Sequence, residues 1–67
     1  MEREHGIIER GEIIEVKTGG YIIASADRDG IITPPLGPLE SGQSYSVNDK
    51  VYYFIFKDGT GRIICKL

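Results

Sequence analysis

The side chains most often used in catalysis and metal binding are few and scattered in this sequence. His5 is the only histidine, and Cys65, the only cysteine, stands near the other end of the chain on the predicted core face of the last strand, so no metal-ligand spacing is present. A buried thiol without a basic partner is also a poor nucleophile. Glu9, Glu12 and Glu15 would need a second carboxylate across a pocket to act as an acid/base pair, and a solvated strand edge explains them better. The sequence therefore predicts no catalytic residue, no metal site and no cofactor, and it argues against an enzyme.

The tyrosines offer a different chemistry, which is the stacking of a ring on a base or a sugar. Tyr21 and Tyr52 are the candidates, because tyrosine suits surfaces that are partly apolar and partly wet. Tyr53 shares a strand face with aliphatic neighbours and is predicted to lie in the core. The alternative for Tyr52 is that its ring only covers the outside of the fold.

Several charged residues follow the last predicted hairpin. Lys57, Arg62 and Lys66 are placed to contact phosphates along one side of it, although ordinary solubility charges explain them equally well. Asp58 is predicted to cap its own turn, because an aspartate side chain bonds to the backbone two residues ahead. The net charge of −2 argues against indiscriminate binding to polyanions, since counterion release rewards an excess of lysine and arginine.

The length and composition fit one small domain. The chain has 67 residues, which is enough for a single hydrophobic core. Its apolar runs are far shorter than the roughly 20 residues that a membrane-spanning helix needs. One cysteine cannot form an internal disulfide, which indicates a reducing compartment. We therefore expect a cytoplasmic protein that does not bind membranes.

Five segments rich in β-branched and aromatic residues alternate with turns that contain glycine or proline, which predicts strands and no long helix. Pro34 and Pro35 should end the third strand, because proline cannot donate to a ladder. Residues 1–6 are predicted to form a flexible tail. Residues 34–48 form the longest irregular segment, of a length that is often functional. The predicted strands are residues 7–17, 21–25, 31–33, 51–56 and 62–67.

Alternation along the last two strands predicts which side chains face the core. The inward set is Val51, Tyr53, Ile55, Ile63, Cys65 and Leu67, and the outward set is Tyr52, Phe54, Phe56, Arg62, Ile64 and Lys66. Five short strands are too few for a good sandwich, and closing them into a barrel removes their unpaired edges. Residues 7–67 are therefore predicted to form one all-β, five-stranded barrel of the oligonucleotide/oligosaccharide-binding (OB) type, with an SH3-like barrel as the alternative.

Glycine corners and aliphatic residues follow one another in a characteristic order along most of the chain. The positions are Gly11, Ile13, Val16 and Gly20 with residues 21–23, then residues 30–32, then residues 47–51, 54–58 and 61–64. This order resembles the S1 RNA-binding domain, and especially the S1-like repeats of the bacterial conserved virulence factor B family. The resemblance covers about residues 11–66 and implies an OB fold.

The S1 resemblance also implies a binding face. In S1 domains that bind RNA, it consists of aromatic residues near the second strand, a polar residue, often His, at the end of the third strand, and an Asp and an Arg around the last hairpin. Asp58 and Arg62 match the last two positions, and Thr33 stands in place of the His. Gly19 and Ile22 stand at the two aromatic positions. Because each stacked base contributes about 1–3 kcal/mol, the loss of two rings implies weak binding.

Together these patterns predict a nucleic-acid-binding module that binds single-stranded RNA weakly, as part of a larger protein or assembly. Tyr21 or Tyr52 would substitute for the missing rings. The predicted site residues are Tyr21, Thr33, Tyr52, Lys57, Asp58 and Arg62, with Lys17 as a further phosphate contact. The alternative is a protein-interaction or structural barrel whose RNA-binding face has been lost, which the acidic balance and the missing rings favour.

Overall fold

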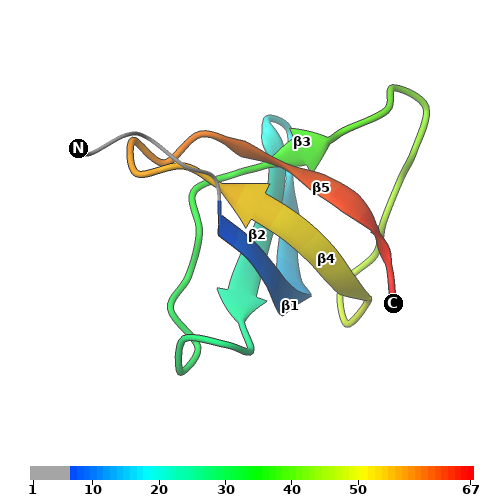
Figure 1. The fold of residues 1–67 in the computed structure, drawn as a ribbon. Helices are drawn as coiled ribbons and strands as arrows, with labels where there is room; N and C mark the ends of the chain where they lie inside the picture. Colours follow the sequence, from blue (N-terminus) through cyan, green and yellow to red (C-terminus); the bar gives the residue numbers. More distant parts are fainter. Residues whose placement is uncertain (1–6) are drawn as a thin grey trace.

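The computed structural model describes residues 7–67, and every regular element within them is a β-strand (Figure 1). The strands are β1 (Ile7–Lys17), β2 (Gly20–Ser25), β3 (Gly37–Pro38), β4 (Lys50–Ile55) and β5 (Gly61–Lys66). Four of them lie within one residue of their predicted bounds. The predicted tail, residues 1–6, lies outside the described residues. Across the described part of the chain, no helix is long and apolar enough to span a membrane.

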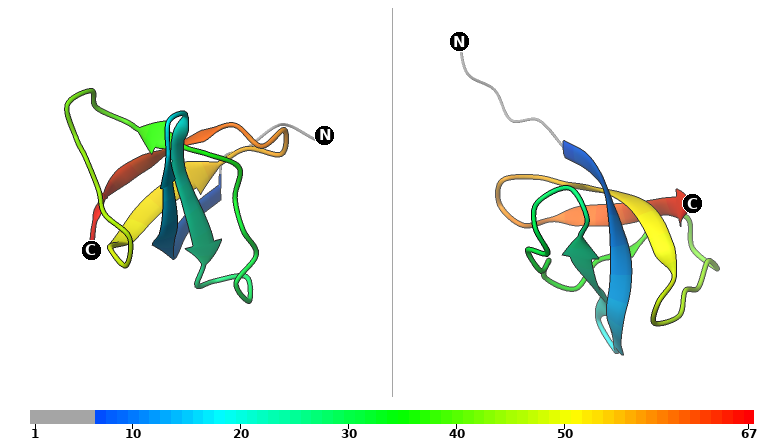
Figure 2. Two further views of the ribbon diagram at one scale, coloured as in Figure 1. Left: turned by 180° about the vertical axis from the view of Figure 1, so that it is seen from behind. Right: turned by 90° about the horizontal axis from the view of Figure 1, so that it is seen from below.

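The five strands form one sheet in the order β2-β1-β4-β5-β3. The long strand β1 is antiparallel to both β2 and β4, β4 is antiparallel to β5, and the short β3 lies parallel to β5. Isolated bridges join Leu36 to Tyr21 and Ile32 to Ala24, which bring the chain before β3 back to β2. Figure 2 shows the sheet curled around a common interior from two directions. The fold is therefore the small, partly open, five-stranded OB-type barrel that the sequence predicted.

The prediction of a third strand at residues 31–33 is wrong. Only Ile32 makes an isolated bridge there. The third strand instead lies at Gly37–Pro38, within the segment 34–48 that was predicted to be irregular.

The two prolines explain this displacement. Pro34 and Pro35 have no N–H to donate, so pairing with β2 stops after Thr33 and resumes at Leu36. The Thr33 side chain fills part of the gap, because its hydroxyl accepts the N–H of Ile23 at 3.1 Å. The third side of the barrel is therefore an interrupted strand rather than a regular one.

The barrel interior contains aliphatic side chains packed around one central tyrosine. Tyr53 is the largest side chain with no exposed surface, and the predicted inward set Val51, Tyr53 and Ile55 on β4 is confirmed. Gly11 allows β1 to pass close to this core, since a Cβ there would lie 2.5 Å from Ile23 Cγ2. The buried apolar residues are Ile13, Ile22, Ile23, Leu36, Tyr45, Val51, Tyr53, Ile55 and Ile63.

The end of β5 faces the opposite way from the prediction. Cys65 and Leu67 were expected to point inward, and both are exposed. The cause is a β-bulge, in which Ile64 is an extra residue on β5 between the pairs that Tyr52 and Tyr53 of β4 make. One extra residue shifts the alternation, so Cys65 lies on the outward side with its partner Tyr52.

Candidate functional site

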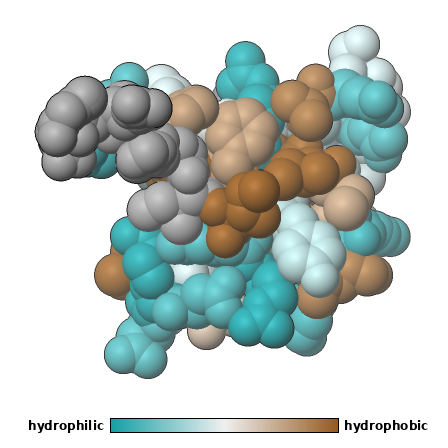
Figure 3. Space-filling model, in the orientation of Figure 1, coloured by the Kyte–Doolittle hydropathy of each residue, from teal (hydrophilic) through white to brown (hydrophobic). Residues whose placement is uncertain are grey.

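A row of aromatic side chains lies on the outer face of the hairpin formed by β4 and β5. Tyr52 and Phe56 are 38% and 37% exposed, and Phe54 between them is half-buried. The rings of Phe54 and Phe56 meet edge to face, with centroids 5.5 Å apart. Arg62 lies opposite Phe54 across the hairpin. Figure 3 shows a band of apolar residues across the middle of this side of the molecule, above a mostly hydrophilic lower part.

Two shallow hollows adjoin at Phe56. The first has a volume of about 270 Å³ and is lined by Phe54, Phe56, Thr60, Gly61 and Arg62. The second, of about 320 Å³, is lined by Arg28, Ile55, Phe56, Lys57 and Gly59. Each hollow thus places at least one cationic side chain beside the same phenyl ring.

Lys57 and Arg62 are the basic residues within 7–67 that form no ion pair. Arg62 makes only a hydrogen bond from Nη1 to the Gly61 carbonyl, at 3.1 Å. Lys17, predicted as a further phosphate contact, pairs instead with Glu15 at 3.3 Å. The remaining pairs are Arg10 with Asp27, Arg28 with Glu9, Lys50 with Glu12 and Lys66 with Asp49. The free positive charge of the described chain is therefore concentrated at the two hollows.

Asp58 belongs to the turn between the two hairpin strands and caps it, as predicted. Its Oδ1 accepts the backbone N–H of Thr60 at 3.0 Å and the Thr60 hydroxyl at 2.7 Å. These bonds from the Thr60 side chain and backbone lower the pKa of the Asp58 carboxyl. The carboxylate thus fixes the loop that carries Lys57.

Two predicted site residues use their polar atoms within the fold. Thr33 is buried, and its hydroxyl accepts the Ile23 N–H described above. Tyr21 is half-buried, its hydroxyl accepts the N–H of Tyr45 at 3.1 Å, and the two rings meet edge to face with centroids 5.5 Å apart. Tyr21 therefore anchors the loop that follows β3, while Tyr52 remains on the outer face of β4 without lining either hollow.

No family model, curated protein or solved structure matches this chain.

The expectation that Glu9 lies on a solvated edge is wrong. Its side chain is only 3% exposed. Oε1 accepts hydrogen bonds from the Tyr53 hydroxyl at 2.5 Å and the Ser25 hydroxyl at 3.2 Å, and Oε2 lies 2.6 Å from Arg28 Nε. Burial, together with the bond to Glu9, raises the pKa of the Tyr53 hydroxyl. Glu9 has the same inward alternation as Gly11, which is the signal that sequence analysis missed.

Phe54, Phe56 and Arg28 line the hollows and were absent from the predicted site. Phe54 and Phe56 had been placed on the outward face of their strand, and this alternation was the available signal. Arg28 belongs to the turn after β2, far from the last hairpin in sequence. No local pattern indicates that these two turns lie together.

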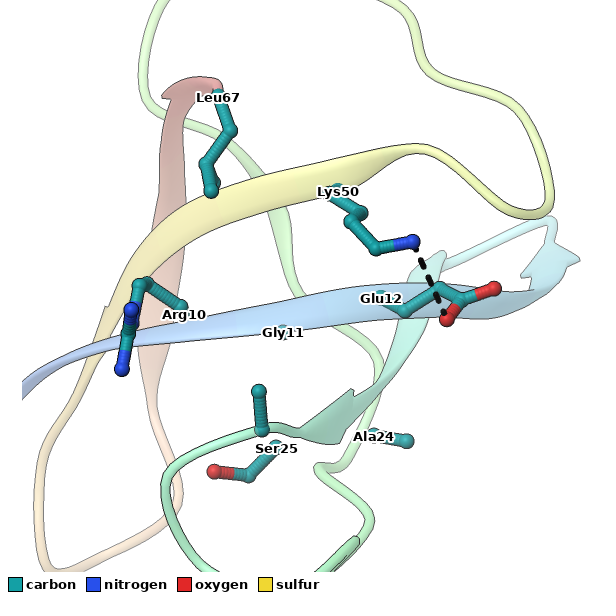
Figure 4. Close-up of a pocket in the computed structure, with 8 residues that line it drawn as sticks. Arg10, Gly11, Glu12, Ala24, Ser25, Lys50 and Leu67 are labelled. Carbon is teal, nitrogen blue, oxygen red and sulfur yellow. Dashed lines mark ion pairs between the residues drawn. The ribbon is translucent and has the colours of Figure 1, made fainter.

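A larger groove of about 420 Å³ lies beside β1 (Figure 4). Its charged side chains are already paired, because Glu12 lies 3.9 Å from Lys50 and Arg10 lies 2.7 Å from Asp27. The groove is lined by Arg10, Gly11, Glu12, Ala24, Ser25, Ala26, Lys50 and Leu67. It offers no unpaired charge for an ionic ligand, and the hairpin is the better candidate.

Within residues 7–67, no group of three or more His, Cys, Asp or Glu side chains is arranged so that it could hold a metal ion. His5 lies outside the described residues.

The cap on the hairpin turn gives a pH-dependent prediction. Because its folded pKa is lowered from the usual 3.8, Asp58 stabilises the turn above that pH, and this contribution is lost as pH falls through the lowered value. The variant Thr60→Val removes the side-chain donor and should move the Asp58 pKa back toward 3.8. A carboxyl-carbon NMR titration measures both values. Identical titration in the two proteins would contradict the assigned cause.

Proposed function

We propose that this barrel binds single-stranded nucleic acid, with RNA as the natural ligand, through the outer face of the β4–β5 hairpin. The carrying observation is the placement of Phe56 between two hollows that hold Lys57 and Arg62, the basic residues without ion pairs in the described chain. An exposed phenyl ring stacks on an unpaired base, and an unpaired cation contacts the phosphates on either side. The match of Asp58 and Arg62 to the S1 pattern supports the same face.

The same features lead us to expect weak binding. The outer face of the β4–β5 hairpin carries few cationic side chains, and the net charge of the chain is −2. Long-range attraction to a polyanion is therefore small. Stacking of one base on the Phe56 ring supplies about 1–3 kcal/mol. Such a module gains useful affinity when it is linked to others in a larger protein or assembly. The proposed role is binding without catalysis.

The test is fluorescence anisotropy of a labelled ten-nucleotide oligouridylate, titrated with the protein at several KCl concentrations. Wild-type affinity should fall as salt rises, and Arg62→Ala or Lys57→Ala should each reduce the slope of log K against log salt by about 0.7. Phe56→Ala should weaken binding about tenfold or more, because it removes the stacking ring.

Two variants provide matched controls. Lys66→Ala removes a cation from the same strand as Arg62, but one that already pairs with Asp49 at 3.8 Å. Val16→Ala shortens an apolar side chain that is 51% exposed and lies on β1 away from the hairpin. Both should bind RNA like the wild type. Equal losses in the control and site variants would contradict a specific site.

Protein binding is the second candidate function, and the exposure of Ile8 favours it. Ile8 lies opposite Phe54 on the neighbouring strand and is 69% exposed, so the aromatic row continues as an apolar surface. Contacts to phosphates are strongest at low salt, so binding should be easiest to detect at about 20 mM KCl. If the protein does not bind oligouridylate there, the RNA proposal is overturned and protein binding is favoured.

A further inference from the structure

Arg28 is held at the second hollow by contacts at both its backbone and its side chain. Its backbone N–H donates to the Ser25 hydroxyl oxygen at 3.0 Å. Its Nε lies 2.6 Å from the carboxylate of Glu9, which is itself fixed by the buried Tyr53 hydroxyl. A guanidinium anchored in this way loses little further freedom when it binds a ligand.

The pairing of Arg28 with Glu9 leaves the two terminal nitrogens of the guanidinium available to a ligand. Arginine has five N–H donors, and in Arg28 only Nε has an acceptor among the described residues. The side chain is 41% exposed and lines the hollow that also contains Phe56 and Lys57. The terminal Nη1 and Nη2 atoms form a fork that matches two oxygens of one phosphate. Arg28 is therefore suited to a bidentate contact, although Glu9 compensates its charge.

We infer that Arg28 is a third phosphate-binding residue of the proposed nucleic-acid site, and that the site takes a segment with phosphates on both sides of one stacked base. One phosphate would lie at the hollow of Arg62, and the other at the hollow of Arg28 and Lys57. The inference rests on the proposed function. In this arrangement the buried Glu9 carboxylate orients the Arg28 guanidinium toward the ligand.

The decisive variant is Arg28→Lys, which keeps the positive charge. A lysine can pair with Glu9, but its single ammonium then has no fork to present to a phosphate. We expect oligouridylate binding to weaken about tenfold, which is the usual scale for a lost hydrogen bond to a charged group, with the salt slope nearly unchanged. The anisotropy assay above measures both quantities, and urea denaturation checks that the variant is folded.

A second pair of variants covers the case in which Arg28→Lys does not fold. Glu9→Gln keeps an acceptor for Tyr53 and Ser25 without a buried charge, so Arg28 can then be removed without leaving an unpaired carboxylate. The double variant Glu9→Gln/Arg28→Ala should bind about tenfold more weakly than Glu9→Gln alone.

The outcomes separate the two proposals. If Phe56→Ala and Arg62→Ala weaken binding while the Arg28 variants bind as tightly as their references, the role of Arg28 is overturned and the RNA site stands. If the wild type does not bind the oligonucleotide at low salt, the proposed function fails, and the inference fails with it.

Discussion

A chain with alanine in place of Tyr53 is expected to be largely unfolded at 25 °C. Tyr53 is the largest side chain with no exposed surface, and its loss leaves a cavity at the centre of the barrel. Replacing a buried aromatic residue by alanine costs about 3–5 kcal/mol. The total stability of a domain of this size is roughly 3–10 kcal/mol, so the change removes much or all of it. Urea denaturation followed by circular dichroism measures the loss.

The variant Tyr53→Phe separates packing from hydrogen bonding. It keeps the ring and removes only the hydroxyl that donates to Glu9, which leaves a buried carboxylate with one donor fewer. We expect a loss of about 1–3 kcal/mol and a folded protein. A Tyr53→Ala protein as stable as Tyr53→Phe would show that the central ring does not support the barrel in the way described.

The second large effect is expected for Gly61→Ala. Gly61 is buried at the start of β5, and a Cβ there would overlap the carbonyl oxygen of Phe54 on the facing strand. Backbone cannot move aside as a flexible side chain can, so the hairpin must open locally. We expect a loss of about 1–3 kcal/mol or more, together with weaker RNA binding, because both hollows are built on this hairpin. Urea denaturation and the anisotropy assay measure the two effects.

Gly19→Ala is the matched control for this change. Gly19 lies in the turn between β1 and β2, and no residue beyond its two chain neighbours has an atom within 4 Å of the position that its Cβ would take. The substitution should be neutral or stabilise the fold by a few tenths of a kcal/mol, because it restricts the unfolded chain. If Gly19→Ala and Gly61→Ala were equally destabilising, the close approach at Gly61 would not be the cause.

Local sequence pattern predicted the four longer strands, which are β1, β2, β4 and β5. The two-residue period of a strand places Tyr53 on the same face of β4 as Val51 and Ile55, and all three are buried in the core. Glycine turns were also predictable, because Gly30 and Gly59 adopt positive φ values of 77° and 92° where another residue would be strained. These features are set by residues close together in the chain.

The remaining features depend on contacts between distant segments. The bulge at Ile64 is defined only by its pairing with β4, and the strand at Gly37–Pro38 forms only because β5 lies beside it. The candidate site likewise contains residues that local pattern predicts and residues that only distant contacts bring there. Arg62 was predicted from the hairpin itself, whereas Arg28 enters the site through a partner, Glu9, on another strand.

The bulge at Ile64 has a practical consequence for measurement. It turns the only thiol of the chain, that of Cys65, outward on the same hairpin as the two hollows but outside their lining. A maleimide fluorophore can therefore be attached to the natural sequence without an introduced cysteine. Cys65 is paired with Tyr52, so the emission of the attached dye should change when a ligand binds to the neighbouring aromatic rings. Binding could then be followed by fluorescence of the protein itself.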